Sequence, residues 1–138
     1  LWLMVRCRLA MPWLFTAGRG TPSLLSELQR ELGACDRVDI LVSFITQSGV
    51  RKLLDILQRI TAVDAQGRPG TRLRILTTTY TGATEMQALD LLARLPGVEV
   101  RVSLDGRRTR LHAKAGIFHR DSGFGSAGGR FCRFPLRR

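Results

Sequence analysis

The feature that most constrains the fold is an alternation of short apolar runs and amphipathic segments in the middle of the chain. RVDILVSFI (residues 37–45) and RLRILTTTY (72–80) have the length and β-branched content of strands buried on both faces. Between them, VRKLLDILQRI (50–60) has apolar residues at helical spacing and charged residues on the opposite side. The pattern predicts strands joined by a crossover helix.

Two further helices are predicted, one on each side of this unit. The first has Thr21 as its N-cap, Pro22 at its first helical position and Gly33 as its stop. The second begins with a capping box formed by Thr84 and Gln87.

The remaining elements complete the predicted domain. VEVRVS (98–103) and LHAKAGIF (111–118) alternate as strands. The order helix, strand, helix, strand, helix, strand, strand predicts an α/β domain whose central sheet is largely parallel or mixed and is covered on both faces. We assign this domain to residues 15–124, between a poorly specified N-terminal segment (1–14) and a basic tail rich in glycine and arginine (125–138).

Composition restricts the functional classes. The net charge of +11 favours polyanionic partners, although arginine supplies 20 of the 22 basic residues, which is also typical of a GC-rich coding sequence. Cys7, Cys35 and Cys132 are odd in number and form no C-x-x-C pattern, so we expect neither a disulfide framework nor a metal site. No apolar run approaches the roughly eighteen residues of a membrane span. We therefore expect a cytoplasmic protein with no membrane partner.

The stretch RLHAKAGIFHRDSG holds both histidines and one of the two lysines. In an alternating strand, His112 and Lys114 project side by side, about 6 to 7 Å apart along the backbone. A neutral imidazole nitrogen can attack phosphorus while an adjacent ammonium holds a phosphate oxygen. The triplet therefore suits phosphoryl transfer without a metal, but a solvated histidine and lysine on a polar strand face is the alternative.

Longer stretches carry a more specific resemblance. RLHAKAGIFHRDSGFGSA resembles the HKD motif of the phospholipase D and Nuc nuclease superfamily, which reads H-x-K, four residues, D and then a Gly-Ser segment. SLLSELQRELGACDRVDILVSFITQSGVRKLLDILQRI, LRILTTTYTGATEMQALDLLARLPGVEVRVSLD and TRLHAKAGIFHRDSGF together resemble the phospholipase D-like domain attached to certain bacterial superfamily II DNA/RNA helicases. The resemblance covers roughly residues 14–124.

The resemblance implies an α/β/α sandwich and a metal-independent phosphodiesterase that uses no cofactor. His112 would be the nucleophile that forms a phosphohistidine, and Lys114 would bind phosphate. The family brings two such motifs together, and the second histidine protonates the leaving group. Turnover would therefore need a homodimer or a second half, and any helicase motor would lie outside this chain.

The sequence departs from the family pattern after the triplet. Strict spacing puts the aspartate at His119, whereas Asp121 lies two residues later and is either its substitute or a turn residue. Gly125 and Ser126 match the family's Gly-Ser-x-Asn stretch but come early, and the chain has no asparagine. We retain Ser126 as a candidate phosphate ligand. The abrupt change to GGRFCRFPLRR suggests a truncation or a shifted reading frame.

Other phosphate contacts are expected near the ends of the buried strands. Ser43 and Thr78 are candidates, with the capping of strand ends as the alternative for each. Three arginines precede the triplet and could follow a nucleic-acid backbone: Arg107, Arg108 and Arg110. His119 should face the surface.

Two interpretations remain open. In one, the chain is a nuclease-type phosphodiesterase that acts on nucleic acid, DNA being the first choice. In the other, it is a catalytically incomplete nucleic-acid-binding accessory domain of a helicase. A lipid-cleaving enzyme is less attractive because no amphipathic membrane-binding stretch stands out.

Overall fold

The central apolar runs form parallel neighbouring strands. In a computed structural model that describes residues 2–6, 13–15, 23–105, 111–123 and 125–130, strands and helices alternate through the middle of the chain.

Strand β3 (Arg37–Val42) pairs in parallel with β4 (Arg72–Thr78), and β4 pairs in parallel with β5 (Val98–Ser103). Helices α2 (Gln47–Thr61) and α3 (Met86–Ala93) form the two crossovers. The strand–helix–strand prediction is therefore confirmed.

Four antiparallel strands extend this unit on the other side of β3. β6 (Lys114–His119) pairs with β3, and β7 (Ser126–Arg130) pairs with β6. β1 (Trp2–Arg6) pairs with β7, and β2 (Trp13–Phe15) pairs with β1. The result is one mixed seven-stranded sheet with the order β2-β1-β7-β6-β3-β4-β5.

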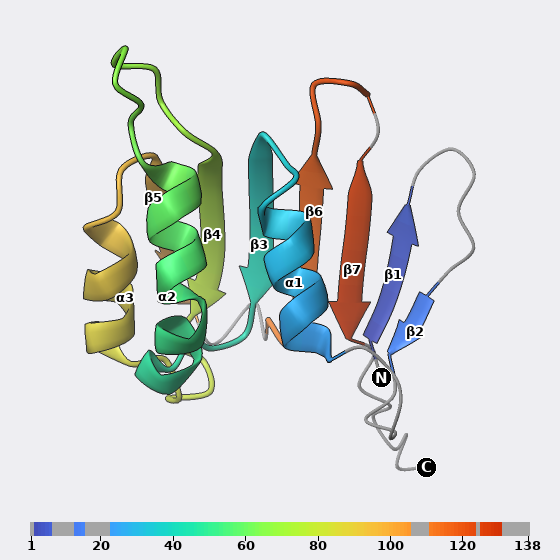
Figure 1. The fold of residues 1–138 in the computed structure, drawn as a ribbon. Helices are drawn as coiled ribbons and strands as arrows, with labels where there is room; N and C mark the ends of the chain where they lie inside the picture. Colours follow the sequence, from blue (N-terminus) through green and yellow to red (C-terminus); the bar gives the residue numbers. More distant parts are fainter. Residues whose placement is uncertain (1, 7–12, 16–22, 106–110, 124, 131–138) are drawn as a thin grey trace.

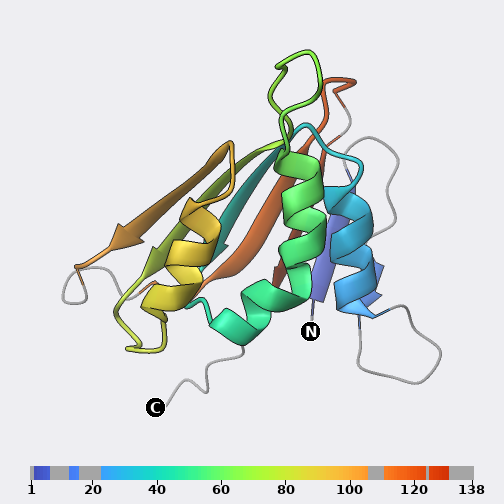
Figure 2. The ribbon, with the colours of Figure 1, turned by 60° about the vertical axis from the view of Figure 1, so that its left-hand side comes forward.

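The three described helices lie on one face of the sheet. Figures 1 and 2 show α1 (Leu24–Leu32), α2 and α3 in front of the strands in both views. Apolar residues from these helices pack on alternate strand residues to form the core, including Leu32, Leu57, Leu92, Val38, Leu73 and Phe118. The sequence predicted helices on both faces of the sheet, but none of the described helices lies on the other face.

The face of the sheet without a helix has a distinct composition, and we call it the open face. Near the ends of β4 and β6 it exposes Leu76, at 41%, and Ile117, at 46%. Elsewhere it carries charged side chains such as Asp39, Arg74 and Arg101, which alternate along their strands with residues of the helix-covered face. Alternation of this kind is typical of a sheet that is packed on one side only.

The helix starts differ from their predicted positions. Ser23 caps α1, since its hydroxyl accepts from the Ser26 N–H at 3.1 Å, whereas the predicted cap Thr21 and first helical residue Pro22 lie outside the described residues. Thr46 caps α2 by accepting from the Gly49 N–H at 3.2 Å. The capping box at α3 is wrong: the Thr84 hydroxyl donates to the Thr78 carbonyl at 2.8 Å, and the N-cap, Glu85, makes no side-chain capping bond.

The flanking segments contribute strands that their sequences did not predict. β1 and β2 lie at or near the N-terminal segment, and β7 lies in the glycine-rich tail. β7 forms because its backbone pairs on both sides, with β6 and with β1. Of the helices in the described ranges, none has the length and apolar character needed to cross a membrane.

Candidate functional site at the carboxyl end of the sheet

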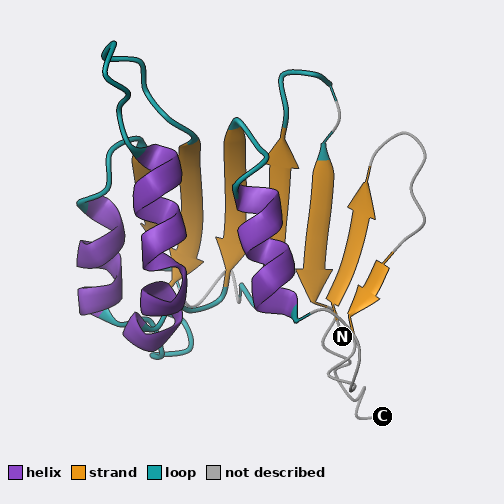
Figure 3. Cartoon of the chain, viewed as in Figure 1, coloured by secondary structure: helices purple, strands orange, loops and turns teal. Residues whose placement is uncertain are grey.

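The candidate site lies where the parallel strands end, which we call the carboxyl end of the sheet. β3, β4 and β5 end here at Val42, Thr78 and Ser103, and β6 begins here because Lys114 is the partner of Val42. Figure 3 shows the loops that follow β3 and β4 at this end, along the lower side of the view. Ligands of open α/β sheets usually bind at such ends.

His112 and Lys114 both lie at this end, on the two sides of a fixed peptide. The carbonyl of Ala113 accepts the N–H of Ser43 at 2.9 Å and the Ser43 hydroxyl at 3.0 Å. The strand itself begins only at Lys114, later than the predicted start at residue 111. His112 therefore precedes the strand and is exposed, whereas Lys114 is half-buried.

The Lys114 ammonium lies over the ring of Phe44, 4.8 Å from its centroid. A cation in this position is attracted to the negative face of the ring, by about 0.5 to 1 kcal/mol at an exposed site. Phe44 is thus a site residue that the sequence did not suggest. The contact holds the ammonium of Lys114, the first residue of β6, beside the loop that follows β3.

The two predicted hydroxyl ligands are already engaged in the protein. Ser43 is fully buried and donates to Ala113, as described above. Thr78 is equally buried; its hydroxyl donates to the Ser103 carbonyl at 3.1 Å and accepts from the Tyr80 N–H at 3.1 Å. Each hydroxyl has one proton to donate. Their observed role is therefore to tie strand ends and loops together.

Asp121 and Ser126 lie at the opposite end of the sheet. β6 runs from Lys114 to His119, which spans about 17 Å at 3.3 Å per residue. Asp121 follows in the turn to β7, where it is exposed and its N–H donates to the Asp36 carboxylate at 2.8 Å. Ser126 begins β7 beside Phe118. The fold does not bring either residue to His112 and Lys114.

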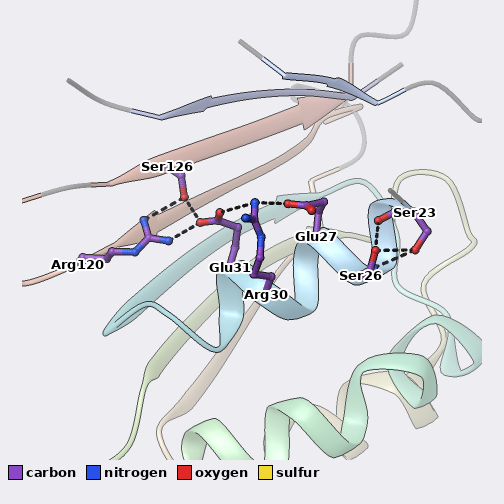
Figure 4. A network of polar contacts seen from close by, with 7 residues as sticks. All are labelled: Ser23, Ser26, Glu27, Arg30, Glu31, Arg120 and Ser126. Carbon is purple, nitrogen blue, oxygen red and sulfur yellow. Dashed lines mark hydrogen bonds and ion pairs between the residues drawn. The ribbon is translucent and has the colours of Figure 1, made fainter. Parts of the chain in front are cut away.

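Ser126 instead belongs to a buried polar network between α1 and the β6–β7 turn. The carboxylate of Glu31, 1% exposed, accepts from the Ser126 hydroxyl at 2.5 Å and from Arg120 Nη2 at 2.5 Å. Arg120 Nε also donates to the Ala34 carbonyl at 2.8 Å. Figure 4 shows this network beside Arg30, which contacts Glu27 and lies 3.7 Å from Glu31. These contacts are structural, and helical spacing gave no indication of them.

A second polar cluster lies on the open face, around Asp39. Arg74 Nε donates to the Asp39 carboxylate at 2.6 Å, and His119 Nε2 lies 2.9 Å from it. Arg37 Nη2 lies 3.3 Å from His119 Nδ1. Because arginine can only donate, Nδ1 accepts and Nε2 carries the proton that is donated to Asp39. The hydrogen bond from Arg74, followed by that from His119, lowers the pKa of Asp39 to about 2.

The cluster also settles where His119 lies. It pairs with Arg37 at the far end of β3, so it is remote from His112. Its side chain is 34% exposed, close to the surface position predicted for it.

The remaining sequence candidates are the three arginines before the triplet, the cysteines and a metal site. Arg107, Arg108 and Arg110 lie outside the described residues. Burial raises the pKa of the Cys35 thiol to about 11, so Cys35 is not poised as a nucleophile. In the described ranges, no group of three or more histidine, cysteine, aspartate or glutamate residues is arranged to hold a metal ion.

The N-terminus of α2 also reaches the carboxyl end of the sheet, but a carboxylate already occupies it. The N–H of Gln47 donates to Glu85 Oε2 at 2.6 Å. An anion at this position satisfies a free N–H and complements the helix dipole.

Comparisons with known proteins add no relative to this description. The chain matches no protein-family model, and no curated protein matches it significantly.

Proposed function

We propose that this chain is a phospholipase D-like phosphodiesterase module that acts on nucleic acid, with His112 as the nucleophile and Lys114 as the phosphate ligand. The observation that supports the proposal is that His112 and Lys114 flank Ala113, whose carbonyl is held by Ser43 at the carboxyl end of the sheet. The mixed α/β sheet with helices on one face is common to this fold and the family's sandwich, and a helix layer on the open face, which none of the described residues forms, is part of the proposal.

The reaction would proceed in two displacements. A neutral nitrogen of His112 attacks phosphorus, the N–P bond forms and the P–O ester bond breaks as the alcohol leaves. Water then attacks the phosphohistidine, the N–P bond breaks and the phosphate monoester is released. The Lys114 ammonium stabilises charge on a non-bridging oxygen in both steps. The departing alkoxide takes a proton from the histidine of a second motif, supplied by another copy of the chain, and this histidine, now neutral, takes a proton from the attacking water in the second step.

A specific observation favours a second function. Asp121 and Ser126, the residues that would extend the motif, lie at the other end of the sheet, and Ser126 is held in the Glu31 network. A chain that keeps only the histidine and lysine would serve as a nucleic-acid-binding accessory domain of a cytoplasmic helicase. Its net charge of +11 suits that role.

Cleavage of labelled single- and double-stranded DNA in EDTA tests the two functions. EDTA suppresses contaminating metal-dependent nucleases. We expect cutting by the wild-type chain, loss of cutting in His112→Ala and retention of cutting in His119→Ala. The last variant is the matched control, because it removes the other histidine, which lies at the far end of β6.

Binding to the same DNA separates the remaining outcomes. If none of the three proteins cuts but all bind DNA equally, the chain is an accessory binding domain. If His112→Ala still cuts in EDTA, His112 is not the nucleophile and the proposed mechanism fails. An acid-labile, base-stable phosphate adduct on the wild-type chain that is missing in His112→Ala would support the covalent step directly.

A further inference from the structure

An apolar cleft lies between α1, α2 and the helix-covered face of the sheet. Its volume is about 290 Å³, near the lower end of the range for small-molecule sites. Leu28 of α1 and Leu53 of α2 form its sides, and Ile40 and Val42 of β3 lie in its floor. No charged side chain is among the described residues that line it.

The strand residues in the floor of the cleft are more exposed toward the carboxyl end of the sheet. Along the helix-covered side of β3, Val38 is fully buried, whereas Ile40 and Val42 are only half-buried. Leu28 and Leu53 are also half-buried although they face the core. Apolar side chains on the middle strand of an α/β sheet are normally covered completely. Their partial exposure indicates that the space between the helices is accessible from outside.

The ammonium group of Lys114 lies beside residues that line the cleft near the carboxyl end of the sheet. Lys114 is the cross-strand partner of Val42, and its ammonium lies 4.8 Å from the centre of the Phe44 ring. Val42 and Phe44 both line the cleft. An apolar channel that ends next to an ammonium group is complementary to a molecule with an apolar chain and one anionic end.

The length of the cleft limits the length of the alkyl chain that it can hold. The cleft follows α2 from Thr46 to Leu57, which is about 16 Å at 1.5 Å per residue, the length of an extended alkyl chain of about a dozen carbons. We propose that this cleft binds a single-chain amphiphile with an anionic head group, with the alkyl chain between α1 and α2 and the head group at Lys114. The inference does not depend on the proposed phosphodiesterase activity.

Calorimetric titration tests whether the alkyl chain of the ligand binds in the cleft. The ligands are octanoate, decanoate and dodecanoate, each used below the concentration at which it forms micelles. We expect one molecule bound per protein chain and an affinity that rises about fourfold for each added methylene group up to the twelve carbons of dodecanoate. An affinity that does not depend on chain length would overturn the proposal.

A matched pair of variants on α1 tests the location. Leu28→Trp fills the cleft, whereas Leu25→Trp places the same side chain on a residue of α1 that is 37% exposed and does not line the cleft. We expect dodecanoate binding to be lost in the first variant and kept in the second. Urea unfolding and circular dichroism verify that both fold. If Leu28→Trp folds and still binds dodecanoate as the wild type does, the cleft is not the site.

Variants of the two lysines test whether the anionic head group binds at Lys114. Lys114→Met should weaken dodecanoate and dodecyl phosphate binding about two- to fivefold, as expected for a partly exposed ion pair. Dodecanol binding should not change. Lys52→Met, on the exposed side of α2, is the control and should leave all three ligands unaffected. The stronger of the two anions identifies the head group, and equal loss in both variants would contradict a specific contact with Lys114.

Discussion

At the residue scale, the polar groups of this protein act mainly by fixing one another. Ser43 was a candidate phosphate ligand, yet it holds the peptide between His112 and Lys114 through two hydrogen bonds to one carbonyl. Ser43 is therefore better described as a positioning residue of the candidate site. The same logic applies to Asp39, whose carboxylate holds Arg74 and His119 together on the open face.

Asp39 makes stability depend on pH in a defined window. Its pKa in the folded chain, about 2, is below the ordinary value of 3.8 because Arg74 and His119 stabilise the charged form. The carboxylate therefore stabilises the folded chain above about pH 4, and this contribution is lost as the pH falls toward 2. Asp39→Asn should lower the free energy of unfolding at pH 7 by about 1 kcal/mol or less, since the partners are partly exposed.

Urea unfolding between pH 7 and pH 2 measures this effect. The difference between wild type and Asp39→Asn should shrink below pH 4 and disappear near pH 2. Asp55→Asn, at an exposed position on α2, controls for the general loss of a negative charge. A difference that persists unchanged at pH 2 would show that the variant acts through packing and not through the charge.

At the scale of elements, the apolar runs were enough to predict the middle of the fold. β3, α2, β4 and β5 have the apolar patterns of buried strands and of an amphipathic helix, and they form in the expected order. β7 could not be predicted because its glycines have no strand preference and its backbone is fixed by pairing with β6 and β1. The capping box failed for a related reason: Thr84 finds a tertiary partner, the Thr78 carbonyl.

The same limits apply to the candidate site. Lys114 could be placed at the start of a strand from the sequence, whereas His112, which was predicted in the same strand, precedes it. The length of β6 then determines that Asp121 lies at the other end of the sheet, although the spacing of the motif suggests a contiguous group. The partner of Ser126 could not be predicted, because Glu31 lies 95 residues away on a helix whose spacing marks only the apolar side.

The Glu31 network is the element-scale tie between α1 and the β6–β7 turn. Arg120→Ala should lower the free energy of unfolding by about 3 to 5 kcal/mol, because it leaves a buried carboxylate without its main cation. The double variant Glu31→Leu, Arg120→Met removes both charges and should recover most of that loss. Urea unfolding of the single and double variants forms a mutant cycle. A double variant as unstable as Arg120→Ala would show that the network matters for its shape and not for charge compensation.

At the scale of the whole molecule, the positively charged side chains differ in how freely they can bind an anionic partner, because some of them already form ion pairs within the protein. Five of the eleven carboxylates form ion pairs with arginine in the described ranges: Glu27, Glu31, Asp39, Asp64 and Glu99. An arginine that is already paired has less free charge to offer to a polyanion. Arg101, for example, donates to Glu99 at 2.6 Å on the far side of the sheet from the helices.

Salt dependence of DNA binding should distinguish paired from unpaired cations. Lys52 is exposed in the first turns of α2, near the carboxyl end of the sheet, and has no ion pair among the described residues. If DNA binds at that end, Lys52→Gln should reduce the slope of log K against log salt concentration by about 1, whereas Arg101→Gln should leave it unchanged. Fluorescence anisotropy with a labelled duplex at several salt concentrations measures both slopes. Equal reductions of the slope in Lys52→Gln and Arg101→Gln would mean that DNA binding depends on the total charge of the chain. DNA binding at the carboxyl end of the sheet would then be wrong, even if the fold and the His112 chemistry were right.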